Sequence, residues 1–182
     1  IAKLYIDEDI SRIIICLSEL LRISICKQNE YISIRDEIDY VKKYLTIQNI
    51  RYKNKFDAVF EVADDVLDKK ILKLTLQPLV ENCIYHGIEN MERKGLIEIH
   101  AFQNGSNVII KVSDNGLGMK EERIQELNSM QIHGEDDNSA SIAVKNINKR
   151  IKLHFGEEYG LKFVKNDGPG ITVIVKIPAI EN

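Results

Sequence analysis

Two polar strings within apolar sequence constrain this chain more than any other feature. Residues 76–87 read Leu-Gln-Pro-Leu-Val-Glu-Asn-Cys-Ile-Tyr-His-Gly, a pattern that predicts a helix with an acid and an amide side by side. Residues 113–119 read Ser-Asp-Asn-Gly-Leu-Gly-Met and follow an apolar run typical of a buried strand. A helix with metal and phosphate ligands, beside a strand that ends in a carboxylate, would make a nucleotide pocket.

In the first string, Asn82 is the candidate metal ligand. An amide that faces inward from a helix can give one neutral oxygen to Mg²⁺, which prefers oxygen ligands and keeps several waters. The neighbouring Glu81 points about 100° away around the helix, so the two side chains cannot share one role. His86 follows one turn later and could stack on a base or hydrogen-bond a phosphate. The alternative interpretation is an amphipathic helix whose polar residues face solvent.

In the second string, Asp114 is the candidate base-reading residue. A carboxylate just past a buried strand is well placed to accept a hydrogen bond from the exocyclic amine of adenine. Gly116 and Gly118 permit positive φ and let the backbone approach a flat base. The alternative is an ordinary turn, because Asn-Gly after a strand is also typical of turns. The two strings together favour a nucleotide pocket more strongly than either does alone.

The rest of the chain predicts a helical arm, residues 1–53, followed by a layered α/β domain, residues 54–182. Apolar residues recur at helical spacing over 7–27 and 34–53. The period then changes, and Asn104-Gly105 is a strong hairpin signal between two strands. We expect strands at 56–62, 96–102, 108–112, 161–164 and 171–177, helices at 73–86, 120–129 and 142–155, and a mobile loop at 131–141.

Composition argues against several other classes of protein. The 182 residues carry a net charge of −3, so no basic surface indicates nucleic-acid binding. No apolar run approaches the roughly 20 residues needed to span a bilayer. The chain does not begin with Met, and we expect it to be a piece of a longer protein. Its three cysteines lack metal-ligand spacing and fit a reducing cytosol, and no Walker-type phosphate loop or Ser/His/Asp set is evident.

Together, these strings resemble the Bergerat-type ATPase superfamily of histidine kinases, gyrase, Hsp90 and MutL. Within it, residues 76–82 are similar to the asparagine box of LytS/YesM-type sensor histidine kinases. Residues 34–51 resemble the helices that in this subfamily lie between the phosphoacceptor histidine and the ATPase domain. The pattern Asn146-Ile-Asn-x-Arg150-Ile and the final Val-Ile-Val-Lys-Ile-Pro178 continue the likeness, which therefore covers nearly the whole chain.

The resemblance implies an α/β fold of the Bergerat type, an α+β two-layer sandwich. A mixed β-sheet would be backed by helices and preceded by the helical arm, with ATP between the helices and a flexible lid at 131–141. It also implies the cofactors ATP and Mg²⁺, and it assigns roles by position. Asn82 would hold the metal, Asp114 would bind adenine, and Gly116 and Gly118 would shape the base pocket. The remaining expected site residues are His86, Asn146 and Thr172 on the nucleotide, and Glu81 as a tentative catalytic contact.

The implied activity is that of a protein histidine kinase, an ATP-dependent phosphotransferase of two-component signal transduction. The γ-phosphoryl group of ATP would pass to a histidine upstream of this fragment, and then to a response regulator in a phosphorelay. The resemblance further implies a homodimer in the full-length protein. It also implies a cytoplasmic domain of a bacterial inner- or plasma-membrane protein, attached only through segments outside this fragment.

The chain departs from the family pattern at several positions. It lacks the phosphoacceptor histidine, and Ser141 and Ala143 stand where the lid has glycines. Ile171 follows the last glycine where the family has Thr, which moves the hydroxyl of Thr172 to the other face of a strand. These changes motivate an alternative, a degenerate non-catalytic module that acts through protein contacts. Hydrolytic relatives carry a carboxylate one helical turn before the Asn, and Pro78 at that position favours a kinase over a hydrolase.

Overall fold

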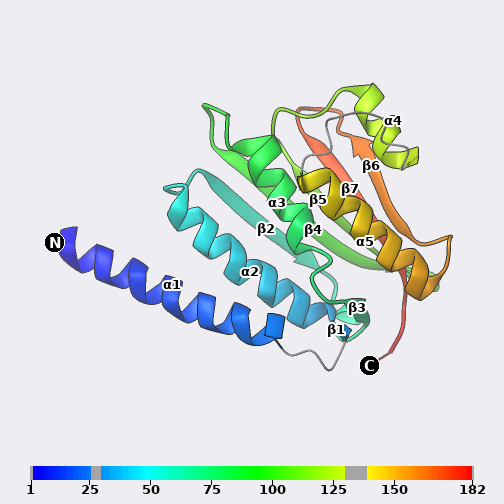
Figure 1. The fold of residues 1–182 in the computed structure, drawn as a ribbon, viewed down its shortest axis with the longest axis horizontal. Coiled ribbons are helices and arrows are strands. Elements are labelled where there is room, and N and C mark those ends of the chain that lie inside the picture. Colours follow the sequence, from blue (N-terminus) through cyan, green and yellow to red (C-terminus); the bar gives the residue numbers. More distant parts are fainter. Residues whose placement is uncertain (1, 26–29, 130–138, 182) are drawn as a thin grey trace.

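The computed structural model describes residues 2–25, 30–129 and 139–181 of the chain. Two helices, α1 (Ala2–Ile25) and α2 (Ile34–Arg51), pack side by side at the N-terminal end (Figure 1). Ser33 begins α2, because its side-chain oxygen accepts the N–H of Asp36 at 3.0 Å. The two helices expected in the N-terminal arm are present, whereas the division into an arm at 1–53 and a domain at 54–182 stays a prediction.

The centre of the molecule is a mixed sheet in the strand order β2-β4-β5-β7-β6. Its first pair is parallel and the other neighbours are antiparallel. The predicted Asn104-Gly105 turn joins the second and third strands, and Gly105 takes the positive φ of 60° that such turns require. The strands are β2 (Phe56–Val62), β4 (Gly95–Asn104), β5 (Asn107–Asp114), β6 (Gly160–Lys165) and β7 (Ile171–Pro178).

A single layer of helices covers one face of this sheet (Figure 1). It contains α2, α3 (Gln77–Asn82) with its π-helical continuation η2 (Cys83–Ile88), and α5 (Ser139–Phe155), while α4 (Glu121–Ser129) lies against β6. Alternate strand residues such as Ile97, Ile110 and Val175 are fully buried beneath these helices. The expected two-layer α/β sandwich is confirmed.

The predicted helix at 73–86 was wrong at its start. Residues Lys70–Leu72 form a short strand, β3, which pairs antiparallel with β1 (Tyr31–Ser33). Leu74 then has a φ of 59°, a left-handed conformation that a right-handed helix cannot include. The helix therefore begins at Gln77, with Pro78 in its first turn, and runs on to Ile88.

Two other boundaries differ from the sequence-based expectation. Helix α1 already begins at Ala2, and α5 begins at Ser139, so residues 139–141 of the expected loop are helical. Residues 131–138 of that loop lie outside the described part of the chain. A short 3₁₀ turn, η1 (Asp64–Val66), follows β2.

In the part of the chain that the structure describes, no helix has both the length and the apolar character needed to cross a membrane.

Candidate functional site

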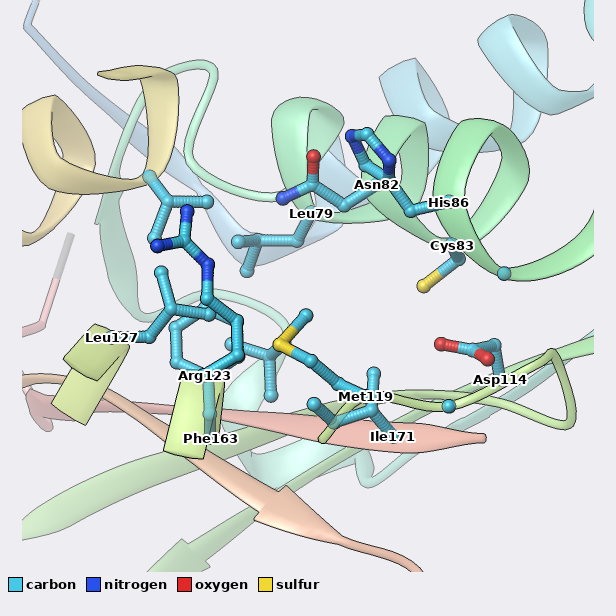
Figure 2. A pocket seen from close by; sticks show the side chains of 14 residues that line it. Leu79, Asn82, Cys83, His86, Asp114, Met119, Arg123, Leu127, Phe163 and Ile171 are labelled. Atoms are coloured by element: carbon cyan, nitrogen blue, oxygen red, sulfur yellow. The ribbon is translucent and has the colours of Figure 1, made fainter. Parts of the chain in front are cut away.

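A cavity of about 310 Å³ opens between the helix layer and the sheet. Figure 2 shows α3 and η2 forming one wall, with Asp114 and Ile171 on the opposite side. This volume falls at the lower end of the roughly 300–1,000 Å³ typical of small-molecule sites. The lining residues are Leu79, Asn82, Cys83, His86, Gly87, Asp114, Gly118, Met119, Arg123, Leu127, Val144, Phe163, Ile171 and Val173.

Asp114 is the carboxylate of this cavity. It is the last residue of β5, it is 4% exposed, and its side chain points toward the cavity (Figure 2). Its Oδ1 accepts the N–H of Gly116 at 2.7 Å, and the N–H of Ile171 and the thiol of Cys83 also donate to the carboxylate. Burial raises the pKa of Asp114, and these three donors oppose that rise because they favour the charged form.

Cys83 lies directly above Asp114 and was not recognised as a site residue from the sequence (Figure 2). Burial, followed by the charge of Asp114, raises the pKa of this thiol well above its ordinary value. The thiol therefore stays protonated and donates to the carboxylate. Its position directly after Asn82 was visible in the sequence, but its contact partner lies on a different element and was not.

Two glycines bring the helix and the loop after β5 into direct contact. A β-carbon on Gly87 would lie 2.8 Å from Oδ1 of Asp114, and one on Gly116 would overlap the backbone of Gly87. The N–H of Leu117 donates to the carbonyl of Gly87 at 3.0 Å, which fixes this approach. Gly116 thus lies behind the cavity, whereas Gly118, with a φ of 74°, lines it.

Asn82 and His86 also line the cavity, and Figure 2 labels both on the helix that carries Leu79 and Cys83. His86 lies within the π-helical turn at Cys83–Ile88, which directly follows Asn82, and such turns are frequent at functional sites. Among the described residues, the amide of Asn82 has no hydrogen-bond partner, so its oxygen can serve a ligand. Within the same residues, no three His, Cys, Asp or Glu side chains form a group that could hold a metal ion.

Arg123 of α4 adds a positive charge to the cavity, and the sequence patterns did not indicate it. Its Nη1 donates to Glu126 at 2.8 Å, while the side chain lines the cavity across from Asn82 (Figure 2). Apolar side chains of Met119, Leu127 and Phe163 complete this side. A guanidinium group beside these apolar side chains is compatible with a ligand that combines a flat base with anionic oxygens.

Besides Gly116, which lies behind the cavity, three more of the expected site residues do not line it. Glu81 accepts the side-chain N–H of Gln77 at 2.7 Å, and Asn146 is exposed on α5. Thr172 donates to Asn166 at 2.7 Å on the other face of β7, and Ile171 takes the cavity side. The expected contacts of Glu81, Asn146 and Thr172 with a nucleotide therefore stay predictions.

Comparison with protein families gives two matches. The model of the histidine kinase-, DNA gyrase B-, and HSP90-like ATPase family matches residues 67–179. The model of the histidine kinase family matches residues 1–56. The first match contains the whole cavity, and the second contains α1 and α2.

Individual relatives agree with these matches. The sensor histidine kinase YesM of Bacillus subtilis is 35% identical over 178 residues, 98% of this chain and 29% of YesM. The sensor protein LytS of Oceanobacillus iheyensis is 31% identical over 166 residues, 90% of this chain and 28% of LytS. The chain therefore spans less than a third of the length of these relatives.

Solved structures of similar fold include domains of histidine kinases. That of ThkA has a TM-score of 0.62 at 18% identity, and the match covers 82% of this chain and 97% of that domain. The histidine kinase domain of a blue-light activated kinase from Erythrobacter litoralis has a TM-score of 0.59 at 15% identity, with 94% of this chain and 75% of that domain covered. At such identities the likeness shows the fold.

Proposed function

Because the chain belongs to the histidine kinase-, DNA gyrase B-, and HSP90-like ATPase family, we propose that it is the ATP-binding catalytic region of a two-component sensor histidine kinase. The γ-phosphoryl group of ATP would pass to a histidine in a part of the protein outside this chain, and then to a response regulator. The single observation that carries this proposal is the buried carboxylate of Asp114 in the cavity. Asn82 and Arg123 line the same cavity.

In this proposal Asp114 reads the adenine. Its Oδ1 accepts the N–H of Gly116, and the donors Cys83 and Ile171 fix the orientation of the carboxylate. Such a fixed acceptor can take a hydrogen bond from the exocyclic amine of adenine. Guanine has a carbonyl at the same place, and its partially negative oxygen would repel the carboxylate. The site should therefore prefer adenine nucleotides.

The phosphates would lie toward Asn82, His86 and Arg123, which line the cavity away from Asp114. Mg²⁺ is usually held by one or two protein oxygens together with substrate phosphates, so the amide oxygen of Asn82 fits it as a sole protein ligand. When bound, the ion would neutralise the charge of the phosphate oxygens. Arg123 is a cation that can donate hydrogen bonds, so it would also neutralise the charge of the phosphate oxygens.

Catalysis would then consist mainly of positioning and charge neutralisation, as is general for phosphoryl transfer. Met119, Leu127 and Phe163 give the cavity an apolar side, which limits the access of water to the bound nucleotide. Pro78 lies one helical turn before Asn82, so the helix carries no carboxylate there to activate a water. This favours transfer to a protein side chain over hydrolysis.

The whole protein would work as a homodimer, with its catalytic region on the cytoplasmic side of a bacterial inner or plasma membrane. The family match over residues 1–56 supports this assembly, because it assigns α1 and α2 to a histidine kinase. The membrane segments, the signal-sensing part and the phosphoacceptor histidine would lie outside this chain.

Calorimetric titration with a non-hydrolysable ATP analogue, with and without Mg²⁺, tests the proposal. We expect specific binding that Mg²⁺ strengthens. An absence of binding at millimolar nucleotide, in a sample shown to be folded by circular dichroism, would overturn the kinase proposal. It would favour instead the degenerate module that acts through protein contacts.

A further inference from the structure

A buried carboxylate on α2 holds the segment that leads into α3, the helix that carries Asn82. Glu37 has 0% of its surface exposed. Its Oε1 accepts the N–H of Leu76 at 2.7 Å, and its Oε2 accepts the N–H of Leu74 at 2.9 Å. The N–H of Thr75 also donates to this carboxylate. One side chain of α2 therefore binds three consecutive peptide groups.

These peptide groups form the entry to α3. Leu76 directly precedes the helix and offers no side-chain cap, and its carbonyl accepts the N–H groups of Leu79 and Val80, both at 3.1 Å. The first N–H groups of a helix lack partners within it and favour a negative charge nearby. The hydrogen-bond acceptor at this point usually comes from the side chain of the residue that begins the helix. Here it comes from Glu37, on a different helix.

The segment held by Glu37 is also strained. Leu74 has a φ of 59°, which is unfavourable for a residue with a β-carbon and persists only when the surroundings hold it. Burial raises the pKa of Glu37 to about 7, so keeping a carboxylate at this position is costly. An apolar side chain would avoid that cost, but it could not hold the three N–H groups.

Tyr44, about two turns further along α2, makes a second contact with the same helix. Its hydroxyl hydrogen-bonds to Glu81, which directly precedes Asn82, and to Tyr85, which follows Asn82 by three residues. Burial, followed by the charge of Glu81, raises the pKa of Tyr44, so the hydroxyl keeps its proton and donates. Helix α2 therefore holds α3 at its start and again beside Asn82, and Figure 1 shows the two helices side by side.

We propose that Glu37 is a positioning residue for the nucleotide site, a remote cap of α3 that sets where Asn82 stands relative to Asp114. An ion pair between Glu19 and Lys43, at 2.7 Å, joins α1 to α2. A displacement of the helical arm would reach Asn82 through Glu37, so the arm and the nucleotide site are coupled. This link to the nucleotide rests on the proposed function, whereas the capping of α3 does not.

The test compares Glu37→Gln with Asp39→Asn, a change at an exposed acid of the same helix. Glutamine offers one acceptor oxygen, so either Leu74 or Leu76 loses its partner. We expect amide hydrogen exchange at one of these two residues, followed by NMR at about pH 8, to rise roughly tenfold or more, the scale of a lost bond to a charged group. The affinity for the Mg²⁺-bound ATP analogue should fall about five- to fiftyfold by the same reasoning. Asp39→Asn should change neither quantity.

A further variant separates positioning from packing. Glycine adopts a φ near 60° without strain, so Glu37→Gln combined with Leu74→Gly should recover most of the lost affinity. A folded Glu37→Gln protein with unchanged amide exchange would overturn the capping, and one with unchanged affinity would overturn the coupling. If Glu37→Gln does not fold, a double variant that also fails to fold or to bind would overturn the inference. Should the unaltered chain not bind nucleotide at all, the proposed function fails, while the exchange comparison still decides the capping.

Discussion

A β-carbon on Gly87 would lie 2.8 Å from Oδ1 of Asp114, so the helix backbone at Gly87 packs directly on the carboxylate of the cavity. Gly87 does not have positive φ, and its requirement for glycine comes from this contact alone. The position of the Asp114 carboxylate, which we propose reads the adenine base, is therefore set by a close approach between a helix and a strand end.

We expect Gly87→Ala to destabilise the fold by about 1–3 kcal/mol, the usual cost of forcing a methyl group into a packed site. It should also weaken nucleotide binding, because the methyl group displaces the carboxylate of Asp114. Chemical denaturation and calorimetric titration measure the two effects. Gly168→Ala is the matched control, since a β-carbon there meets nothing within 4 Å. Equal stability of the two variants would contradict the predicted close approach.

Asp114→Asn should weaken binding of adenine nucleotides by about 1–3 kcal/mol, the scale of a hydrogen bond to a charged group. The amide keeps one oxygen for the N–H of Gly116 and has a similar shape, so the fold should survive. Titration with ATP and with GTP would show a reduced preference for the adenine base. Asp65→Asn, at an exposed position outside the cavity, serves as the control. Identical affinities of the Asp114 variant and the unaltered chain would remove the assigned adenine contact.

Asn82→Ala should affect Mg²⁺-dependent binding more than Mg²⁺-free binding. The amide has no hydrogen-bond partner among the described residues, so its loss should leave the stability nearly unchanged. The measurement is the ratio of affinities for an ATP analogue with and without Mg²⁺. We expect that ratio to fall toward one in the variant and to stay unchanged in Asn90→Ala, at an exposed position outside the cavity. An unaltered ratio in Asn82→Ala would rule out the metal role.

Glu37 should make the stability of the fold depend on pH. Burial raises its pKa from 4.5 to about 7, with three backbone N–H groups and Arg150 opposing the rise. Between these two values the folded protein binds more protons than the unfolded chain, so stability falls as pH rises through this window. The contribution is roughly 3 kcal/mol, at about 1.4 kcal/mol per pKa unit. The raised pKa of Asp114 acts in the same direction.

Denaturation of the unaltered chain and of Glu37→Gln across that pH window checks this expectation. The variant should lose most of the decline and keep only the part due to Asp114. If both proteins show the same slope, the carboxylate of Glu37 does not titrate in the way its burial implies.

The sequence by itself determined the architecture and singled out two residues that line the cavity. Alternating apolar residues predicted the strands, helical spacing predicted α1, α2 and α5, and the turn Asn104-Gly105 predicted the hairpin. Asn82 and Asp114 could be singled out because each stands at a recognisable point of a local pattern. Such patterns are local, and a period of two or 3.6 residues can be read over a few turns.

Only the tertiary structure decided which side chains meet. The thiol of Cys83 on Asp114, the guanidinium of Arg123 across from Asn82, and the carboxylate of Glu37 at the start of α3 each join elements that are distant in the sequence. The start of that helix was mispredicted for the same reason, because helical spacing continues through Leu74 while a contact from α2 holds this residue at positive φ. A local pattern fixes the face on which a side chain lies, but the partner on that face depends on how the layers pack.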